Sequence, residues 1–182
     1  MATLLGLAGC GHGSPTLGTT DVCSLFDADV LAGAVPDGQV SVSALNSYDD
    51  DGASGVCELS NLGGVFPRDS DFGLLRLEIR KMHGTRSAEQ RDWAANLLRI
   101  TCERVFEQPH VQPGQPPAER SCASVTLDAD MSPPSKSCDY GAIRGGVAAW
   151  GYFLFPATAP QSEIDRNCRV TRQAVDSRLT RW

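Results

Sequence analysis

The sequence predicts an α+β fold, with an antiparallel sheet, helices packed on one side of it, and disulfide cross-links. Residues 74–81 and 147–155 have the pattern of strands, and a segment with helical spacing follows each of them. The order strand, strand, helix with hairpin-length links favours an antiparallel sheet over alternating β-α units. Six of the seven cysteines lie in the part of the chain that contains these elements, which suits three disulfides.

The first predicted element is a helix over residues 21–35. Asp21 can cap its first turn, and Pro36-Asp37-Gly38 is a turn signal that ends it. Apolar residues recur between these limits at helical spacing: Leu25, Phe26, Val30, Leu31 and Val35.

Residues 74–81 alternate as the residues of a half-buried strand do. We expect Leu75, Leu77 and Ile79 to point to one face, and Arg76, Glu78 and Arg80 to point to the other. A helix over residues 87–106 is predicted next, with Ser87 and Gln90 as a capping box. Its inner face is expected to carry Ala95, Leu98, Cys102 and Val105.

Residues 147–155 are apolar on both faces, so this strand is expected at the centre of the sheet. Gly145-Gly146 before it fits a two-residue hairpin turn. The last predicted element is a helix over residues 162–182, whose inner face carries Ile164, Cys168, Val175, Leu179 and Trp182.

Two parts of the chain show the same succession of a cysteine segment, a Gly-Gly pair, a strand and a helix. Cys57-Glu58-Leu59 through Gly63-Gly64, and Cys138-Asp139-Tyr140 through Gly145-Gly146, each precede a strand and a helix. This order indicates one globular domain over residues 21–182 with two candidate halves, 21–106 and 122–182. A proline-rich connector over residues 107–121 joins them. The alternative is that the two segments agree by chance.

Cys10 follows Leu7-Ala8-Gly9 and precedes a stretch rich in Gly, Ser, Pro and Thr. This order resembles a bacterial lipobox, a cleavage site whose cysteine takes a diacylglycerol and becomes the mature N-terminus. The resemblance makes residues 1–9 a signal-peptide remnant, and residues 10–20 a lipid-anchor cysteine with a flexible tether. Because residues 1–9 lack the basic end of a secretory signal, we expect the start codon to lie upstream. The alternative is that Cys10 is a plain thiol.

The cysteine count supports export. With Cys10 set aside as a thioether, six cysteines remain for three disulfides in an oxidising compartment: Cys23, Cys57, Cys102, Cys122, Cys138 and Cys168. Each half contains three of them, so full oxidation requires an odd number of bonds between the halves. No Cys-x-x-Cys or Cys-x-x-His is present, so we expect neither a metal site nor a cofactor.

Asp21, Cys23, Leu25 and Cys57 resemble a pattern found in a group of uncharacterised actinobacterial lipoproteins. These proteins share a lipobox, a short linker and an Asp-x-Cys-x-Leu helix whose cysteine bonds a second one downstream. The resemblance implies a Cys23–Cys57 bond and carries no known activity. If Cys122 then bonds Cys138, a Cys102–Cys168 cross-link remains. That connectivity is one of fifteen and is favoured by proximity and symmetry alone.

Charge and hydropathy limit the partners of this chain. A net charge of −6 and a pI near 5.0 argue against nucleic acid, which requires a concentrated basic face. No stretch approaches the ~18 apolar residues of a transmembrane helix. Contact with the membrane is therefore expected through the N-terminal lipid anchor, and an envelope ligand or protein is the expected partner.

Catalytic motifs of the common hydrolases and nucleotide-binding enzymes are absent from the sequence. His83 and His110 fall in predicted loops. Asp49-Asp50-Asp51 resembles the start of a calcium loop, but Glu58 is misplaced as its bidentate ligand. Asp128 and Asp130 could serve glycoside chemistry only if the fold placed carboxylates ~5–9 Å apart.

Trp150 and Tyr152 belong to the aromatic cluster of the second strand. We expect them in the core, and the functional alternative is the wall of an apolar pocket for a lipid or a glycan. The sequence thus predicts a non-enzymatic, membrane-tethered extracytoplasmic lipoprotein that binds a ligand or a partner. The alternative is an envelope hydrolase with an unrecognised Asp/Glu/His site.

Overall fold

The structure is a computed structural model that describes residues 17–35, 37–48, 52–61, 72–82, 87–104 and 111–180. Its elements, in chain order, are η1 (Cys23–Leu25), α1 (Ala28–Ala32), β1 (Gln39–Tyr48), β2 (Gly52–Ser60), β3 (Leu74–Met82), α2 (Ser87–Arg104), β4 (Gln112–Pro113), β5 (Arg120–Asp128), β6 (Ser135–Arg144), β7 (Val147–Pro156) and α3 (Gln161–Leu179).

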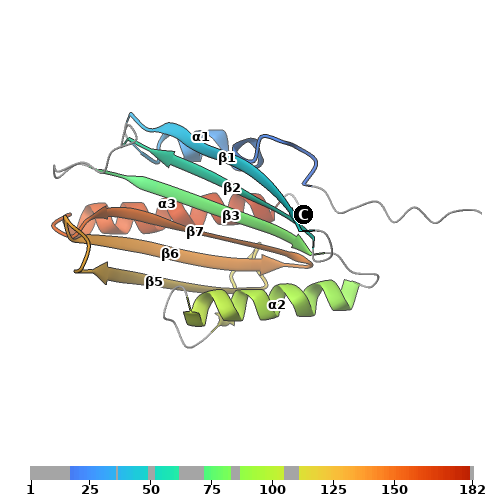
Figure 1. Cartoon of the computed structure of the whole chain (residues 1–182). Coiled ribbons are helices and arrows are strands. Elements are labelled where there is room, and N and C mark those ends of the chain that lie inside the picture. Colours follow the sequence, from blue (N-terminus) through green and yellow to red (C-terminus); the bar gives the residue numbers. More distant parts are fainter. Residues whose placement is uncertain are drawn as a thin grey trace, which may run out of the picture.

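The seven strands form one antiparallel sheet in the order β1-β2-β3-β7-β6-β5-β4 (Figure 1). The α+β class and the antiparallel sheet are thereby confirmed. Each half of the chain supplies three consecutive long strands, and β3 and β7 meet at the centre. Cys57 of β2 pairs with Leu77 of β3, and Cys138 of β6 pairs with Phe153 of β7, so each cysteine lies in the strand next to one of the two central strands.

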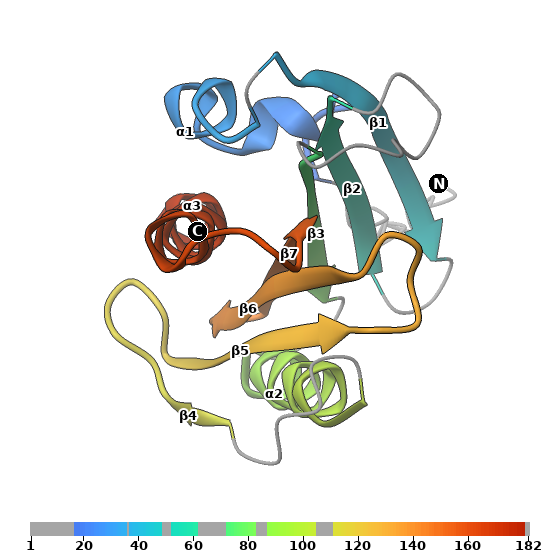
Figure 2. The same ribbon diagram turned by 90° about the vertical axis from the view of Figure 1, so that its left-hand side faces the viewer.

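The helices lie on both faces of this sheet, which differs in one respect from the expectation. Figure 2 shows α1 and α3 on one face and α2 on the other. The cause is the strand β7, whose two faces are both apolar. Ala149 and Phe153 belong to the core cluster that contains the α3 residues, whereas Ala148 and Trp150 belong to the cluster that contains the α2 residues. Each face of β7 therefore needs a helix to cover it.

The larger core cluster lies between the sheet and the helices α1 and α3. The predicted alternation of residues 74–81 is confirmed there, since Leu75, Leu77 and Ile79 are 0% exposed. Burying each of these side chains contributes roughly 1.5–3 kcal/mol to folding. The smaller cluster lies under α2 and includes Leu98 and Cys102.

The turn between β6 and β7 is the two-residue hairpin that the sequence predicts. Arg144 pairs with Val147, and Gly145 has a φ of +56°, a conformation that favours glycine. A Cβ at Gly146 would lie 2.7 Å from the Cβ of Gln90, because α2 crosses the hairpin closely. The paired glycines thus serve both the turn and the docking of α2.

Three disulfides join the elements: Cys23–Cys57, Cys102–Cys122 and Cys138–Cys168. The set of six bonded cysteines and the pair implied by the family resemblance are confirmed. One bond joins the two halves, as the odd-number requirement demands. Each bond fixes a helical segment to a strand: η1 to β2, α2 to β5, and α3 to β6.

The expected pairs Cys122–Cys138 and Cys102–Cys168 are wrong, for a reason that depends on register. Cys122 pairs with Gly141, which is three positions from Cys138, so the two side chains point to opposite faces of the sheet. Cys102 and Cys168 belong to α2 and α3, and the sheet separates these helices. Neither expected bond can form in this fold.

The N-terminal boundary also differs from the expectation. Leu17 was expected in the tether but is 3% exposed and packs in the core. A Cβ at Gly55 would lie 2.9 Å from Leu17 Cδ1 and 2.7 Å from Val22 Cγ2, so both residues lie directly on β2. The folded part therefore includes residues 17–20, whereas residues 1–9 and Cys10 lie outside the described residues.

The predicted helix over residues 21–35 is two short helices, η1 and α1. Val22, rather than Asp21, occupies the N-cap position of η1, and the Asp21 Oδ1 accepts from the Cys23 amide at 3.1 Å from one residue further out. Asp27 then starts α1 by accepting from the amides of Asp29 and Val30. This cap at Asp27 starts a new helix, so the single continuous helix predicted from the apolar spacing does not form.

Candidate ligand-binding cavity

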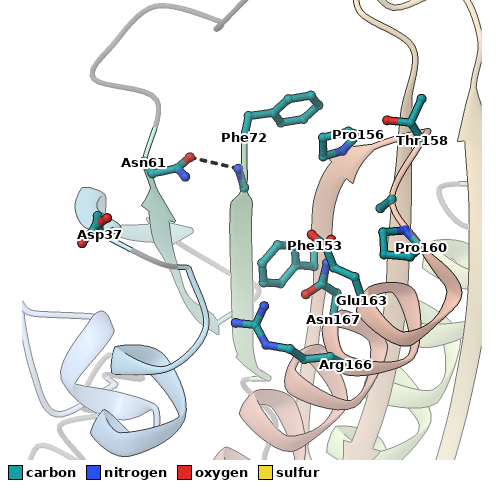
Figure 3. A pocket seen from close by; sticks show the side chains of 12 residues that line it. Asp37, Asn61, Phe72, Phe153, Pro156, Thr158, Pro160, Glu163, Arg166 and Asn167 are labelled. Atoms are coloured by element: carbon teal, nitrogen blue, oxygen red, sulfur yellow. Dashed lines mark hydrogen bonds between the residues drawn. The ribbon is translucent and has the colours of Figure 1, made fainter. Parts of the chain in front are cut away.

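A cavity of about 660 Å³ opens at the end of the sheet where β7 leads into α3 (Figure 3). Four places in the chain supply its walls: the turn after α1, the end of β2, the start of β3, and the β7–α3 junction. Its lining residues are Asp37, Asn61, Phe72, Gly73, Phe153, Pro156, Thr158, Ala159, Pro160, Glu163, Arg166 and Asn167.

Two phenylalanines belong to the apolar part of this cavity, together with Pro156, Ala159 and Pro160. Phe153 projects from the α3 face of β7 and is 2% exposed, and Phe72 precedes β3 and is 5% exposed. The strand ends beside them are tied together, since the Gly73 amide donates to Asn61 Oδ1 at 2.9 Å and Gly73 O accepts from the Asn61 amide at 3.4 Å. The apolar wall is therefore held by sheet backbone rather than by a loop alone.

The first turns of α3 supply the polar wall. Pro160 begins the helix, and its carbonyl accepts from the amides of Glu163 and Ile164. Because residues three and four apart share one side of a helix, Pro160, Glu163 and Asn167 line the cavity together. Figure 3 shows the Asn167 amide between Glu163 and Arg166, beside the Phe153 ring.

Asn167 is the least exposed polar residue of this wall, at 1%. Its side-chain Oδ1 is buried and has no hydrogen-bond partner in the described part of the protein. A buried acceptor without a donor costs roughly 1–3 kcal/mol, and such groups are rare in folded proteins. This atom is therefore the strongest indication that the cavity receives a hydrogen-bond donor.

The charged groups lie nearer the solvent. Arg166 Nη2 donates to the carbonyls of Gly33 at 3.0 Å and Ala34 at 3.1 Å, which ties the end of α1 to α3. Glu163 is half-buried, and Asp37 is exposed in a turn where its φ is +56°. The charges thus surround the entrance, while the amide and the aromatic rings form the deeper surface.

Trp150 and Tyr152, the pocket candidates from the sequence, do not line this cavity. Trp150 packs under α2, and the Arg80 guanidinium lies 5.3 Å from its ring centroid. Tyr152 is half-buried on the same face of β7, and burial is the main reason that its pKa is raised. Side chains alternate along a strand, so the neighbouring Phe153 points to the opposite face and reaches the cavity.

The other candidates from the sequence are not brought together. Glu58 forms an ion pair with Arg76 at 3.2 Å, and Asp128 accepts from the amides of Asp130 and Met131 in a turn. These are structural contacts. His83, His110 and Asp49–Asp51 lie outside the described residues. Over the described ranges, no group of three or more His, Cys, Asp or Glu side chains could hold a metal ion.

Two buried polar groups on β6 were missed in the sequence. Asp139 accepts from Ser124 at 2.9 Å and from Thr126 at 3.0 Å, and burial raises its pKa. Tyr140 donates to Asp176 at 3.0 Å, and burial together with that carboxylate raises the pKa of Tyr140 to about 12. These contacts join β6 to β5 and to α3, and strand register alone determines them.

Comparisons with known proteins add no relative: no family model, curated protein or solved structure matches the chain. The three disulfides indicate an oxidising, extracytoplasmic environment. In the part of the chain that the structure describes, none of the helices has the length and apolar character needed to span a bilayer. Function must therefore be argued from the cavity itself.

Proposed function

We propose that this protein is an extracytoplasmic lipoprotein, anchored through Cys10, whose domain binds a small ligand in the cavity beside α3. The observation that carries the proposal is the buried, unpartnered Asn167 Oδ1 in the wall of a 660 Å³ cavity. Binding sites for small molecules have this size and combine apolar walls with a few placed polar groups.

The lipid anchor would keep the cavity close to the membrane. Seven residues lead from Cys10 to Leu17, the first buried residue of the described domain. A fully extended chain of that length reaches at most about 25 Å. The domain would thus work at the membrane surface, on ligands of the cell envelope.

The lining of the cavity favours binding over catalysis. Its described lining residues include no His, Cys or Ser that could serve as a general base or a nucleophile. Of its two carboxylates, Asp37 is exposed in a turn, and Glu163 is half-buried beside Asn167 and Arg166 with no second acid beside it among the described lining residues. A site that holds a ligand without transforming it accounts for this arrangement.

The cavity is tested by blocking it. Thr158 is exposed at the entrance, so Thr158→Trp should narrow the cavity without disturbing the core. Thr180→Trp, at the exposed far end of α3, is the matched control. Small molecules that raise the melting temperature of the wild type and of Thr180→Trp should lose this effect with Thr158→Trp. Equal responses in all three proteins would contradict the proposed site.

The anchor is tested separately with the protein isolated from its native host. Wild type should partition into the detergent phase of a phase-separating detergent, and Cys10→Ala should partition into the aqueous phase. If Cys10→Ala partitions like the wild type, the anchor proposal fails and the cavity proposal stands.

A further inference from the structure

The position of the charges restricts the ligand that can reach the deepest part of the cavity. Asn167, Phe153 and Phe72 are buried, whereas Asp37 is exposed and Glu163 and Arg166 are only half-buried. A charged ligand group beside Asn167 would lose its hydration and would meet one carboxylate and one guanidinium, Glu163 and Arg166, whose opposite charges offset each other. Desolvation of this kind is unfavourable, so the group that meets Asn167 should be uncharged.

The ligand group beside Asn167 must be both a hydrogen-bond donor and a hydrogen-bond acceptor. Asn167 Oδ1 needs a donor, while the neighbouring Arg166 has only donors to offer. A hydroxyl can donate to the amide oxygen and accept from a guanidinium at the same time. It also satisfies the Asn167 amide in either of its two orientations, because it is donor and acceptor alike.

The rest of the lining points to several hydroxyls on an apolar frame. Six of the twelve lining residues that the structure describes are polar: Asp37, Asn61, Thr158, Glu163, Arg166 and Asn167. A pocket for an acyl chain would be lined predominantly by apolar side chains, which is not the case here. Ala159 and Pro160, which are less buried than the two phenylalanines, nevertheless offer apolar surface against which the C–H face of a sugar ring can pack.

We infer that the ligand is a neutral sugar, bound with the C–H face of one ring against Pro160 and with a ring hydroxyl donating to Asn167 Oδ1. The inference rests on the proposed function, because it names the ligand class of the same cavity. The remaining hydroxyls face Glu163 and Arg166 at the entrance, where carboxylate oxygens accept and guanidinium hydrogens donate.

The test is a titration of the uniformly ¹⁵N-labelled domain, followed in amide correlation spectra. The probes are the methyl glycosides of glucose, galactose, mannose and N-acetylglucosamine, with leucine and hexanol as the zwitterionic and lipid-like alternatives. At least one glycoside should shift the Asn167 side-chain NH₂ and the Phe153 amide. Its ring protons should also give nuclear Overhauser effects to the side-chain protons of Pro160, a measurement that needs no variant.

Asn167→Leu should bind that glycoside about tenfold more weakly, the loss expected for one buried hydrogen bond. Asn96→Leu is the matched control, because Asn96 is exposed on α2, far from the cavity in sequence and fold. Its affinity should equal that of the wild type. Equal affinity of Asn167→Leu and wild type would overturn the assigned hydrogen bond.

The outcomes separate the ligand class from the site. If only leucine or only hexanol shifts the Asn167 and Phe153 signals, the sugar inference is overturned and the proposed binding cavity survives. If none of the six probes shifts these signals, the sugar inference also fails, and the blocking experiment with Thr158→Trp then decides the proposed function independently.

Discussion

Asn167→Leu should stabilise the ligand-free protein, although it replaces a polar residue that is almost completely buried. The amide oxygen has no donor in the described structure, so the folded state bears its desolvation cost of roughly 1–3 kcal/mol. Leucine has nearly the same volume, adds no unsatisfied atom and adds apolar surface beside Phe153. We expect a gain of about 1–2 kcal/mol, which for a chain of this size raises the melting temperature by roughly 2–8 °C.

The contrast with Thr171→Val makes this prediction specific. Thr171 is one turn further along α3, is fully buried, and its hydroxyl donates to the Asn167 carbonyl at 2.9 Å. Removing a hydroxyl that has a partner should destabilise the protein by about 1 kcal/mol. Both variants are measured by urea unfolding at one pH, where the midpoint moves in opposite directions. A folded Asn167→Leu protein that loses stability as Thr171→Val does would refute the argument that the amide is unsatisfied.

Three further predictions concern the buried acids and the disulfides. Burial raises the pKa of Asp139, so the folded state binds its proton more tightly than the unfolded state, and stability should fall as pH rises above the ordinary value of 3.8. Between pH 3.5 and 7, the unfolding midpoint of Asp139→Asn should fall less than that of the wild type. Equal pH dependence of the two midpoints would contradict the raised pKa of Asp139. Because the pKa of Tyr140 is raised to about 12, Tyr140 should still be largely protonated at pH 11 in ultraviolet difference spectra, and Asp176→Asn should lower its pKa. Non-reducing peptide mapping should recover Cys102 with Cys122, and replacing both by alanine should cost about 3 kcal/mol through the lost 20-residue loop closure; recovery of a Cys102–Cys168 peptide would contradict the fold itself.

Patterns within a single element were enough to predict much of the fold. The alternation of Leu75, Leu77 and Ile79 predicted β3, and the two apolar faces of residues 147–155 predicted a central strand. These patterns show which faces of a single strand are buried, because apolar residue types occupy the buried faces. The same pattern also requires helices on both sides of the sheet, because both faces of β7 must be covered. The predicted arrangement, with helices on one side only, did not take this into account.

Features that depend on register could not be predicted. Whether Cys122 can reach Cys138 depends on a three-residue offset between β5 and β6, which no local pattern reveals. The cavity has the same origin. Phe153 reaches it, whereas the more conspicuous Trp150 and Tyr152 point to the other face of β7, and Asn167 becomes an acceptor without a donor only once α3 docks beside that strand.

The bond between Cys23 and Cys57 has a mechanical consequence. A pulling force that enters the domain from its N-terminus passes η1 first, and the disulfide transfers that force directly to β2. The 33 residues enclosed by the bond, from Ser24 to Val56, cannot be drawn out while it is intact. They include α1, β1 and Asp37 at the entrance of the cavity. If force acted between the proposed anchor at Cys10 and the proposed ligand, the disulfide would thus keep this wall of the cavity in place under load.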